Sequence, residues 1–123
     1  MAYLTDRKRA TGLGSSKTGT GHHWLMMVTS VALLPLVVLF VFTFGHALGL
    51  PYAEAAAYYA RPFPSLVAVL TVTVGWFHFR HGAQMAIEDY TGGLTRKALI
   101  IGTICLSYAA AAWALLSIVR VAL

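Results

Sequence analysis

The chain has 123 residues, of which 59% are hydrophobic and 11% are charged, and its mean hydropathy is +0.72. A soluble domain of this size could not bury so much apolar surface, so the composition excludes that class and indicates an integral membrane protein. The formal net charge of +5 does not indicate nucleic-acid binding, because most of the basic residues flank apolar runs, where they set membrane orientation.

Residues 1–23 are polar and rich in glycine, and we predict that they form a cytoplasmic arm. Within it, the stretch 12–21 has no helical or strand period. This stretch is not a phosphate-binding loop, because no Gly-Lys-Ser/Thr sequence ends it ahead of a helix. A cleaved signal peptide is disfavoured, because the apolar run that follows is too long.

Residues 24–123 are predicted to form a single transmembrane domain, and the fold class is an all-α integral membrane protein. Three apolar segments lie at about 24–48, 64–89 and 98–120. Each approaches or exceeds the roughly 20 residues that cross the hydrocarbon of a bilayer.

Two of these predicted helices carry signals for bending or packing. Pro35 is expected to kink the first helix, and the hydroxyls of Thr29 and Ser30 on that helix could satisfy the freed backbone group. Four alanines at 109–112 would let the third helix pack closely against a neighbour. The single cysteine, Cys105, lies in that helix and excludes an internal disulfide or a cysteine zinc site.

The lysines and arginines predict the orientation. The predicted helices place two basic residues on one side of the membrane and six on the other. The two are Arg61 and Arg120, and the six are Arg7, Lys8, Arg9, Lys17, Arg96 and Lys97. Because basic residues are retained on the cytoplasmic side, the N-terminus is predicted to be cytoplasmic and the C-terminus periplasmic. Residues 50–62 then form an outer interfacial loop, whose tyrosines are interpreted as members of an aromatic belt.

The end of the second predicted helix combines several ionisable groups, which are costly at membrane depth and usually persist because they bind something or move charge. At about 100° per residue, four residues share one face of the helix. They are His78, Gly82, Met85 and Asp89. A second polar stripe contains Arg80, Gln84 and Glu88.

His78 precedes Asp89 by eleven residues, or roughly 16–17 Å at 1.5 Å per residue, which places its imidazole near the middle of a bilayer. A neutral imidazole at that depth suits axial ligation of a haem iron, and Gly82 would let the macrocycle approach the backbone. Two alternatives remain open. His78 could be a hydrogen-bonded packing residue, or His81 could be the ligand instead.

Asp89 and Tyr90 lie at the predicted cytoplasmic mouth of the same helix. A phenol can donate to a quinone carbonyl and a carboxylate can relay protons, so the pair is a candidate quinone headgroup site. The alternative is a helix end that is simply solvated at the lipid headgroups.

These residues resemble a known family, the smaller hydrophobic membrane-anchor subunits of succinate dehydrogenase (complex II), and especially the alphaproteobacterial form. The resemblance is carried by HFRHGAQ at 78–84 and IEDY at 87–90. The first part of the chain is also similar, with GLGS at 12–15, GTGHHW at 19–24 and VTSVAL at 28–33.

The resemblance implies a subunit that is not active alone. It would anchor the flavoprotein and iron–sulfur subunits of the enzyme to the bacterial inner membrane and serve electron transport and the tricarboxylic acid cycle. One b-type haem would be shared with a second anchor subunit, with His78 as this chain's axial ligand and Gly82 beside it. Ubiquinone would be bound near the iron–sulfur subunit, where Tyr90 hydrogen-bonds it and Asp89 assists its protonation.

One departure from the family pattern, one residue without an assigned role and two rival functions remain. Members of the family often carry a basic residue soon after the position of His22, and here residues 25–27 are apolar, so His22, His23 or the partner would have to contact a haem propionate. Arg80 points away from His78 on the helix, and we expect it to extend along the Gln84–Glu88 stripe or to pair with the partner. The rivals are a fumarate reductase anchor that uses menaquinone and a structural membrane subunit without haem.

Overall fold

The computed structural model describes residues 5–12 and 19–122, and within this part of the chain all regular secondary structure is helical. The helices are α1 (Asp6–Thr11), α2 (Gly19–Ala47), α3 (Tyr52–Tyr59), α4 (Pro62–Tyr90) and α5 (Gly93–Ala122). Three of them are long and apolar enough to cross a membrane, over Thr20–Ala47, Pro62–Tyr90 and Gly93–Ala122. The all-α class and the three candidate membrane spans are therefore confirmed, whereas the direction in which they cross stays a prediction.

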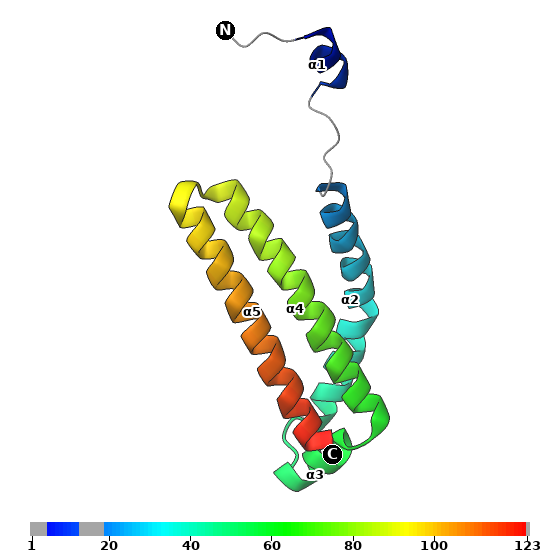
Figure 1. Cartoon of the computed structure of the whole chain (residues 1–123). Helices are drawn as coiled ribbons and strands as arrows, with labels where there is room; N and C mark the ends of the chain where they lie inside the picture. The colour runs from blue at the N-terminus through cyan, green and yellow to red at the C-terminus, as the bar shows by residue number, and fades with distance from the viewer. Residues whose placement is uncertain (1–4, 13–18, 123) are drawn as a thin grey trace.

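Helix α4 is the centre of the bundle, because it packs against both α2 and α5 (Figure 1). The three long helices alternate in direction along the chain. One end of the bundle, here called the Tyr90 end, holds the start of α2, the end of α4 and the start of α5 (Figure 1). The opposite end, called the α3 end, holds α3 and the C-terminus.

The helices extend further than the apolar runs suggested. Helix α2 begins at Gly19, so His22 and His23 belong to the helix and not to the polar arm. Helix α5 begins at Gly93, where a φ of 60° reverses the chain directly after α4. The stretch between the second and third predicted helices (about 89–98) is thus mostly helical. A hydropathy pattern locates only the part of a helix that lies in lipid. Polar turns that extend the helix beyond the lipid have no such pattern, so the helix ends could not be predicted from the apolar runs.

Two short helices were not predicted. Helix α1 lies in the N-terminal arm, parts of which (residues 1–4 and 13–18) are outside the described residues. Helix α3 occupies the predicted outer loop, where Tyr58 packs against His46 with their ring centroids 4.8 Å apart. Burial raises the pKa of the Tyr59 phenol, and the neighbouring Tyr58 raises it further, so Tyr59 stays neutral over the physiological pH range.

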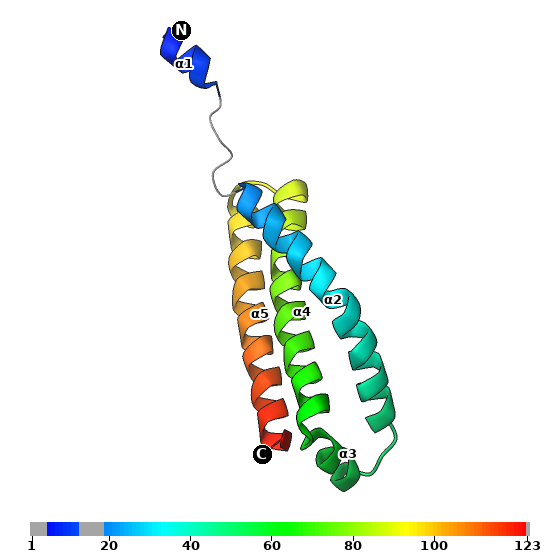
Figure 2. The ribbon, with the colours of Figure 1, turned by 90° about the vertical axis from the view of Figure 1, so that its right-hand side faces the viewer.

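Helix α2 continues through Pro35 and bends along its length (Figure 2). The hydroxyl of Ser30 donates to the carbonyl of Met26, and that of Thr29 donates to the carbonyls of Leu25 and Met26. Neither reaches the carbonyl of Val31, which loses its partner because Pro35 has no N–H. The expected compensation is therefore not found, and Thr29 serves another contact.

Very little of the described chain is buried. Its buried hydrophobic residues are Val67 and Ala68, both on α4. Large apolar side chains face outward instead, with Phe42 73% exposed and Trp113 76% exposed. Such a surface is stable only when lipid or other subunits cover it.

A regular seam joins α2 to α4. Four contacts make up this α2/α4 seam: Met26 with Gly82, Thr29 with His78, Leu33 with Gly75, and Leu36 with Thr71. Along each helix the contacts recur at intervals of three and four residues, as in an antiparallel coiled coil. The two glycines have no side chain in the seam, which lets the helix backbones approach each other.

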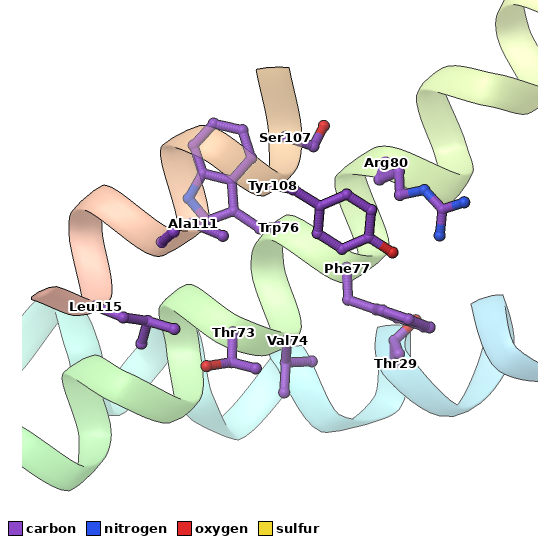
Figure 3. A pocket seen from close by; sticks show the side chains of 11 residues that line it. Thr29, Thr73, Val74, Trp76, Phe77, Arg80, Ser107, Tyr108, Ala111 and Leu115 are labelled. Atoms are coloured by element: carbon purple, nitrogen blue, oxygen red, sulfur yellow. The ribbon is translucent and has the colours of Figure 1, made fainter. Parts of the chain in front are cut away.

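Helix α5 is joined to α4 by a contact between a cation and an aromatic ring. The guanidinium carbon of Arg80 lies 5.4 Å from the centroid of the Tyr108 ring (Figure 3). Arg80 therefore packs against α5, and the expected extension along the Gln84–Glu88 stripe is not seen. In that stripe, Gln84 donates to Glu88 over 2.8 Å.

Replacing Tyr108 by leucine should destabilise the α4–α5 pair by about 0.5–2 kcal/mol, because the ring face that attracts Arg80 is lost. Tyr108→Phe keeps the ring and should remain within about 0.5 kcal/mol of the parent protein. Unfolding of the detergent-solubilised protein in increasing denaturant measures both. Equal destabilisation by the two variants would show that the hydroxyl, and not the ring face, stabilises this contact.

Candidate functional site

His78 lies near the middle of the 29-residue helix α4 and faces α2. Its Nδ1 atom is 2.8 Å from the hydroxyl oxygen of Thr29. No other hydrogen bond of this side chain is found within residues 5–12 and 19–122, and its Nε2 atom is not enclosed. One ring nitrogen thus has a partner inside the protein, and the other has none in the described part of the chain and is not fully buried.

His81, the competing ligand, has a more enclosed environment. It is 9% exposed, and its Nδ1 lies 2.8 Å from the carbonyl oxygen of Phe77. Because a carbonyl can only accept, this nitrogen carries a proton. The ring also packs against those of Phe77 and His22, at centroid distances of 4.3 and 5.0 Å. A large planar cofactor has less room to approach His81 than His78.

His22 comes from the first turns of α2 and lies beside His81 at the Tyr90 end. Its Nε2 atom is buried without a hydrogen-bond partner in the described part of the chain. A buried polar atom without a partner is costly and often marks the place of a group that the structure does not contain. His23, in contrast, is exposed.

Gly82 lies one turn beyond His78, in the α2/α4 seam. A Cβ atom added there would lie 3.5 Å from the terminal methyl carbon of Met26. The space that glycine provides is therefore taken up by a flexible side chain of this same chain. Helix packing explains Gly82 without any cofactor, and a macrocycle could use the space only if Met26 moved aside.

Asp89 and Tyr90 lie in the last turn of α4, and both side chains are exposed. Tyr90 is 88% exposed. Among the residues that the structure describes, neither side chain forms a hydrogen bond or an ion pair. The two groups are adjacent and accessible, but this chain does not enclose a headgroup between them.

A pocket of about 430 Å³ lies between α2, α4 and α5 (Figure 3). Its walls are almost entirely apolar, and its lining residues are Thr29, Thr73, Val74, Trp76, Phe77, Arg80, Ser107, Tyr108, Ala111, Ala112 and Leu115. None of the four predicted site residues lines it. Two polar atoms near it, Nε of Arg80 and Oγ of Ser107, are buried without partners in the described segments.

The donor set can be tested against a haem. No group of three or more histidine, cysteine or acidic residues that could hold a bare metal ion occurs in the described residues. A haem would bring four nitrogens of its own, so this chain would have to supply only one side-chain ligand to the iron. A single imidazole with one hydrogen-bonded nitrogen and one unpartnered nitrogen would fit that need, and His78 has this arrangement.

Sequence reasoning missed the contacts that cross between helices. Thr29 was considered only for its own helix, yet it is the partner of His78. Tyr108 received no role. The signal for Thr29 was available in the antiparallel order of the helices, because a polar residue about ten positions into α2 lies level with one about ten positions before the end of α4.

Comparison with known proteins identifies the family. A model of the succinate dehydrogenase/fumarate reductase transmembrane subunits matches residues 1–119. The chain is also 45% identical to the succinate dehydrogenase hydrophobic membrane anchor subunit of Paracoccus denitrificans, over 100% of this chain and 95% of the relative. No solved structure matches significantly. The resemblance seen in the sequence motifs is confirmed, and the chain belongs to the family of succinate dehydrogenase and fumarate reductase transmembrane subunits, as one of its hydrophobic membrane anchors.

Proposed function

We propose that this chain is the smaller anchor subunit of a succinate:ubiquinone oxidoreductase, that it shares a b-type haem with a second anchor subunit, and that it forms part of the ubiquinone-reduction site. The observation that carries the proposal is the state of His78. Its ring is held by one nitrogen at mid-helix, with the other free, on the same helix that ends in the exposed Asp89 and Tyr90.

His78 would ligate the haem iron from this chain's side, and the second anchor subunit would provide the other axial ligand. The haem supplies a one-electron carrier beside the quinone site. Gly82 would admit the edge of the macrocycle once the Met26 side chain swings away. The unpartnered Nε2 of His22 is this chain's best placed donor for a propionate, because it lies toward the Tyr90 end of the α2/α4 seam.

Ubiquinone would be bound at the Tyr90 end of α4. The phenol of Tyr90 would donate a hydrogen bond to one quinone carbonyl oxygen, and Asp89 would pass one proton from water to that oxygen. Complete reduction to the quinol takes two electrons from the iron–sulfur subunit and a second proton from water at the other carbonyl oxygen. Since Tyr90 is 88% exposed, the rest of the headgroup site must come from other subunits.

The proposed setting is the bacterial inner membrane, with the Tyr90 end toward the cytoplasm. The excess of basic residues on the N-terminal arm and at the start of α5 supports this orientation. Succinate would be oxidised on the flavoprotein subunit in the cytoplasm. The anchor would be inactive without the other subunits.

A fumarate reductase is the second candidate, because the matching family includes the transmembrane subunits of that enzyme. The two enzymes share a reaction that runs in opposite directions and prefer quinones of different potential. The quinone that is extracted with the purified complex separates them: ubiquinone supports the first proposal and menaquinone supports the second.

His78→Ala should remove the six-coordinate low-spin haem spectrum of the purified complex, either because haem is lost or because it stays on the partner's ligand alone. His46→Ala, which removes an imidazole at the α3 end, is the matched control and should leave the spectrum unchanged. A reduced-minus-oxidised difference spectrum measures both. An unaltered low-spin spectrum in His78→Ala, or no haem in the parent complex, would contradict the proposed ligation.

Tyr90→Phe should lower kcat/KM for ubiquinone reduction about 10- to 100-fold, because a hydrogen bond to the quinone is lost. Succinate oxidation with an artificial acceptor that takes electrons from the iron–sulfur subunit should not change. Tyr52→Phe, at an equally exposed tyrosine of the α3 end, is the control. The quinone role of Tyr90 fails if Tyr90→Phe and Tyr52→Phe give the same quinone kinetics.

A further inference from the structure

We propose that Thr29 is a positioning residue for the haem: its hydroxyl fixes the His78 ring with the proton on Nδ1 and directs Nε2 to the iron. This inference rests on the proposed ligation by His78. It assigns a function to a side chain on a different helix from the ligand, at a contact of 2.8 Å.

The direction of the hydrogen bonds around Thr29 follows from which groups can donate a proton and which can only accept one. The Thr29 hydroxyl has one proton and lies 2.8 Å from the carbonyl oxygen of Leu25 and 3.1 Å from that of Met26. Carbonyl oxygens only accept, so the hydroxyl can give its proton to one of them and accept the Nδ1 proton of His78 with a lone pair. Every polar group in this chain of bonds then has a partner.

The reverse arrangement leaves an N–H donor without an acceptor. If the hydroxyl donated to Nδ1, the neutral ring would carry its proton on Nε2, for which the described residues offer no acceptor. An N–H group without a partner in apolar surroundings costs free energy. Iron also requires a lone pair on the ligating nitrogen, so ligation through Nε2 and donation by Nδ1 favour the same tautomer.

The α2/α4 seam holds Thr29 in reach of the ring. On α4, Gly75 and Gly82 lie about one turn to either side of His78, and each faces an apolar side chain of α2. The glycines permit close approach of the two helices, which a bond between a short hydroxyl and a ring nitrogen needs. Rotation of the imidazole would break this bond, so the seam also fixes the plane of the ring.

The hydrogen bond has a predictable electronic effect. An acceptor on Nδ1–H makes the imidazole a better electron donor and therefore favours ferric over ferrous iron. A neutral hydroxyl does this weakly, in contrast to a carboxylate. Removal of the hydroxyl should therefore raise the midpoint potential of the haem and loosen the orientation of the ring.

The experiment compares Thr29→Val, which keeps the shape and loses the hydroxyl, with Thr29→Ser, which keeps the hydroxyl. The matched control is Thr43→Val. Thr43 lies on the same helix and donates to the carbonyl oxygens of Leu39 and Phe40 with the same spacing, but has no histidine partner among the residues that the structure describes. Each whole complex is purified, and its haem content, haem midpoint potential and ferric electron paramagnetic resonance spectrum are measured.

We expect Thr29→Val to shift the midpoint potential upward and to shift or broaden the low-spin resonance, or to lose haem. Thr29→Ser should restore parent values, and Thr43→Val should match the parent. The inference is overturned if Thr29→Val equals the parent in potential and spectrum, if Thr29→Ser behaves like Thr29→Val, or if Thr43→Val causes the same shift. His78→Ala separates the failure of the proposed ligation from the failure of the role of Thr29. If His78→Ala leaves the haem spectrum intact, the proposed ligation is wrong. If His78→Ala removes the low-spin haem spectrum while Thr29→Val equals the parent, only the role of Thr29 is wrong.

Discussion

An imidazole at the centre of an apolar three-helix bundle must have its polar atoms satisfied without help from water. This constraint connects most features of the structure. The Thr29 hydroxyl satisfies one of the two ring nitrogens, Nδ1 of His78, at an oxygen–nitrogen distance of 2.8 Å. That contact in turn requires α2 to run close to α4, which Gly75 and Gly82 permit. The second ring nitrogen, Nε2 of His78, has no partner in the described part of the chain, and we propose that a haem iron is that partner.

Other parts of the chain also have surfaces and polar atoms that no group in the described part of this chain covers or pairs with. Few side chains are buried, large apolar residues face outward on all three long helices, and Tyr90 extends into the surroundings. His22 and Arg80 each have a buried nitrogen without a partner among the described residues. These features are those of one layer of a larger assembly. The shared cofactor, the second anchor and the iron–sulfur subunit that we propose would satisfy these groups together.

Helix α4 sets the geometry between the two proposed centres. Because it is continuous from Pro62 to Tyr90, the separation along the helix axis of His78 and Asp89 remains roughly 16–17 Å. Haem and quinone would then be held at different depths by one rigid element. Motion of the termini or of α3 would not alter that spacing, since neither lies between the two residues.

Much of this fold could be predicted from the sequence, because long apolar runs admit few alternatives once their length matches a bilayer. The placement of His78, Asp89 and Tyr90 on one helix followed in the same way from helical spacing. The helix ends were less predictable, since polar turns such as Gly19–His23 continue α2 beyond its apolar run. Helix α3 had weak signals, Pro51 ahead of it and Glu54 in its first turn, which are easily taken for a loop. The partner of His78 and the contact of Arg80 with Tyr108 depend on the register between helices, which the periodicity of a single helix does not contain.

The most direct test is an experimentally determined structure of the purified complex, at a resolution that separates ligands from neighbouring side chains. It should place Nε2 of His78 at coordination distance from a haem iron, with Nδ1 turned toward the Thr29 hydroxyl and an axial ligand from a second anchor subunit opposite. A His78 ring surrounded only by side chains or acyl chains, with haem absent or ligated elsewhere, would contradict the proposed function.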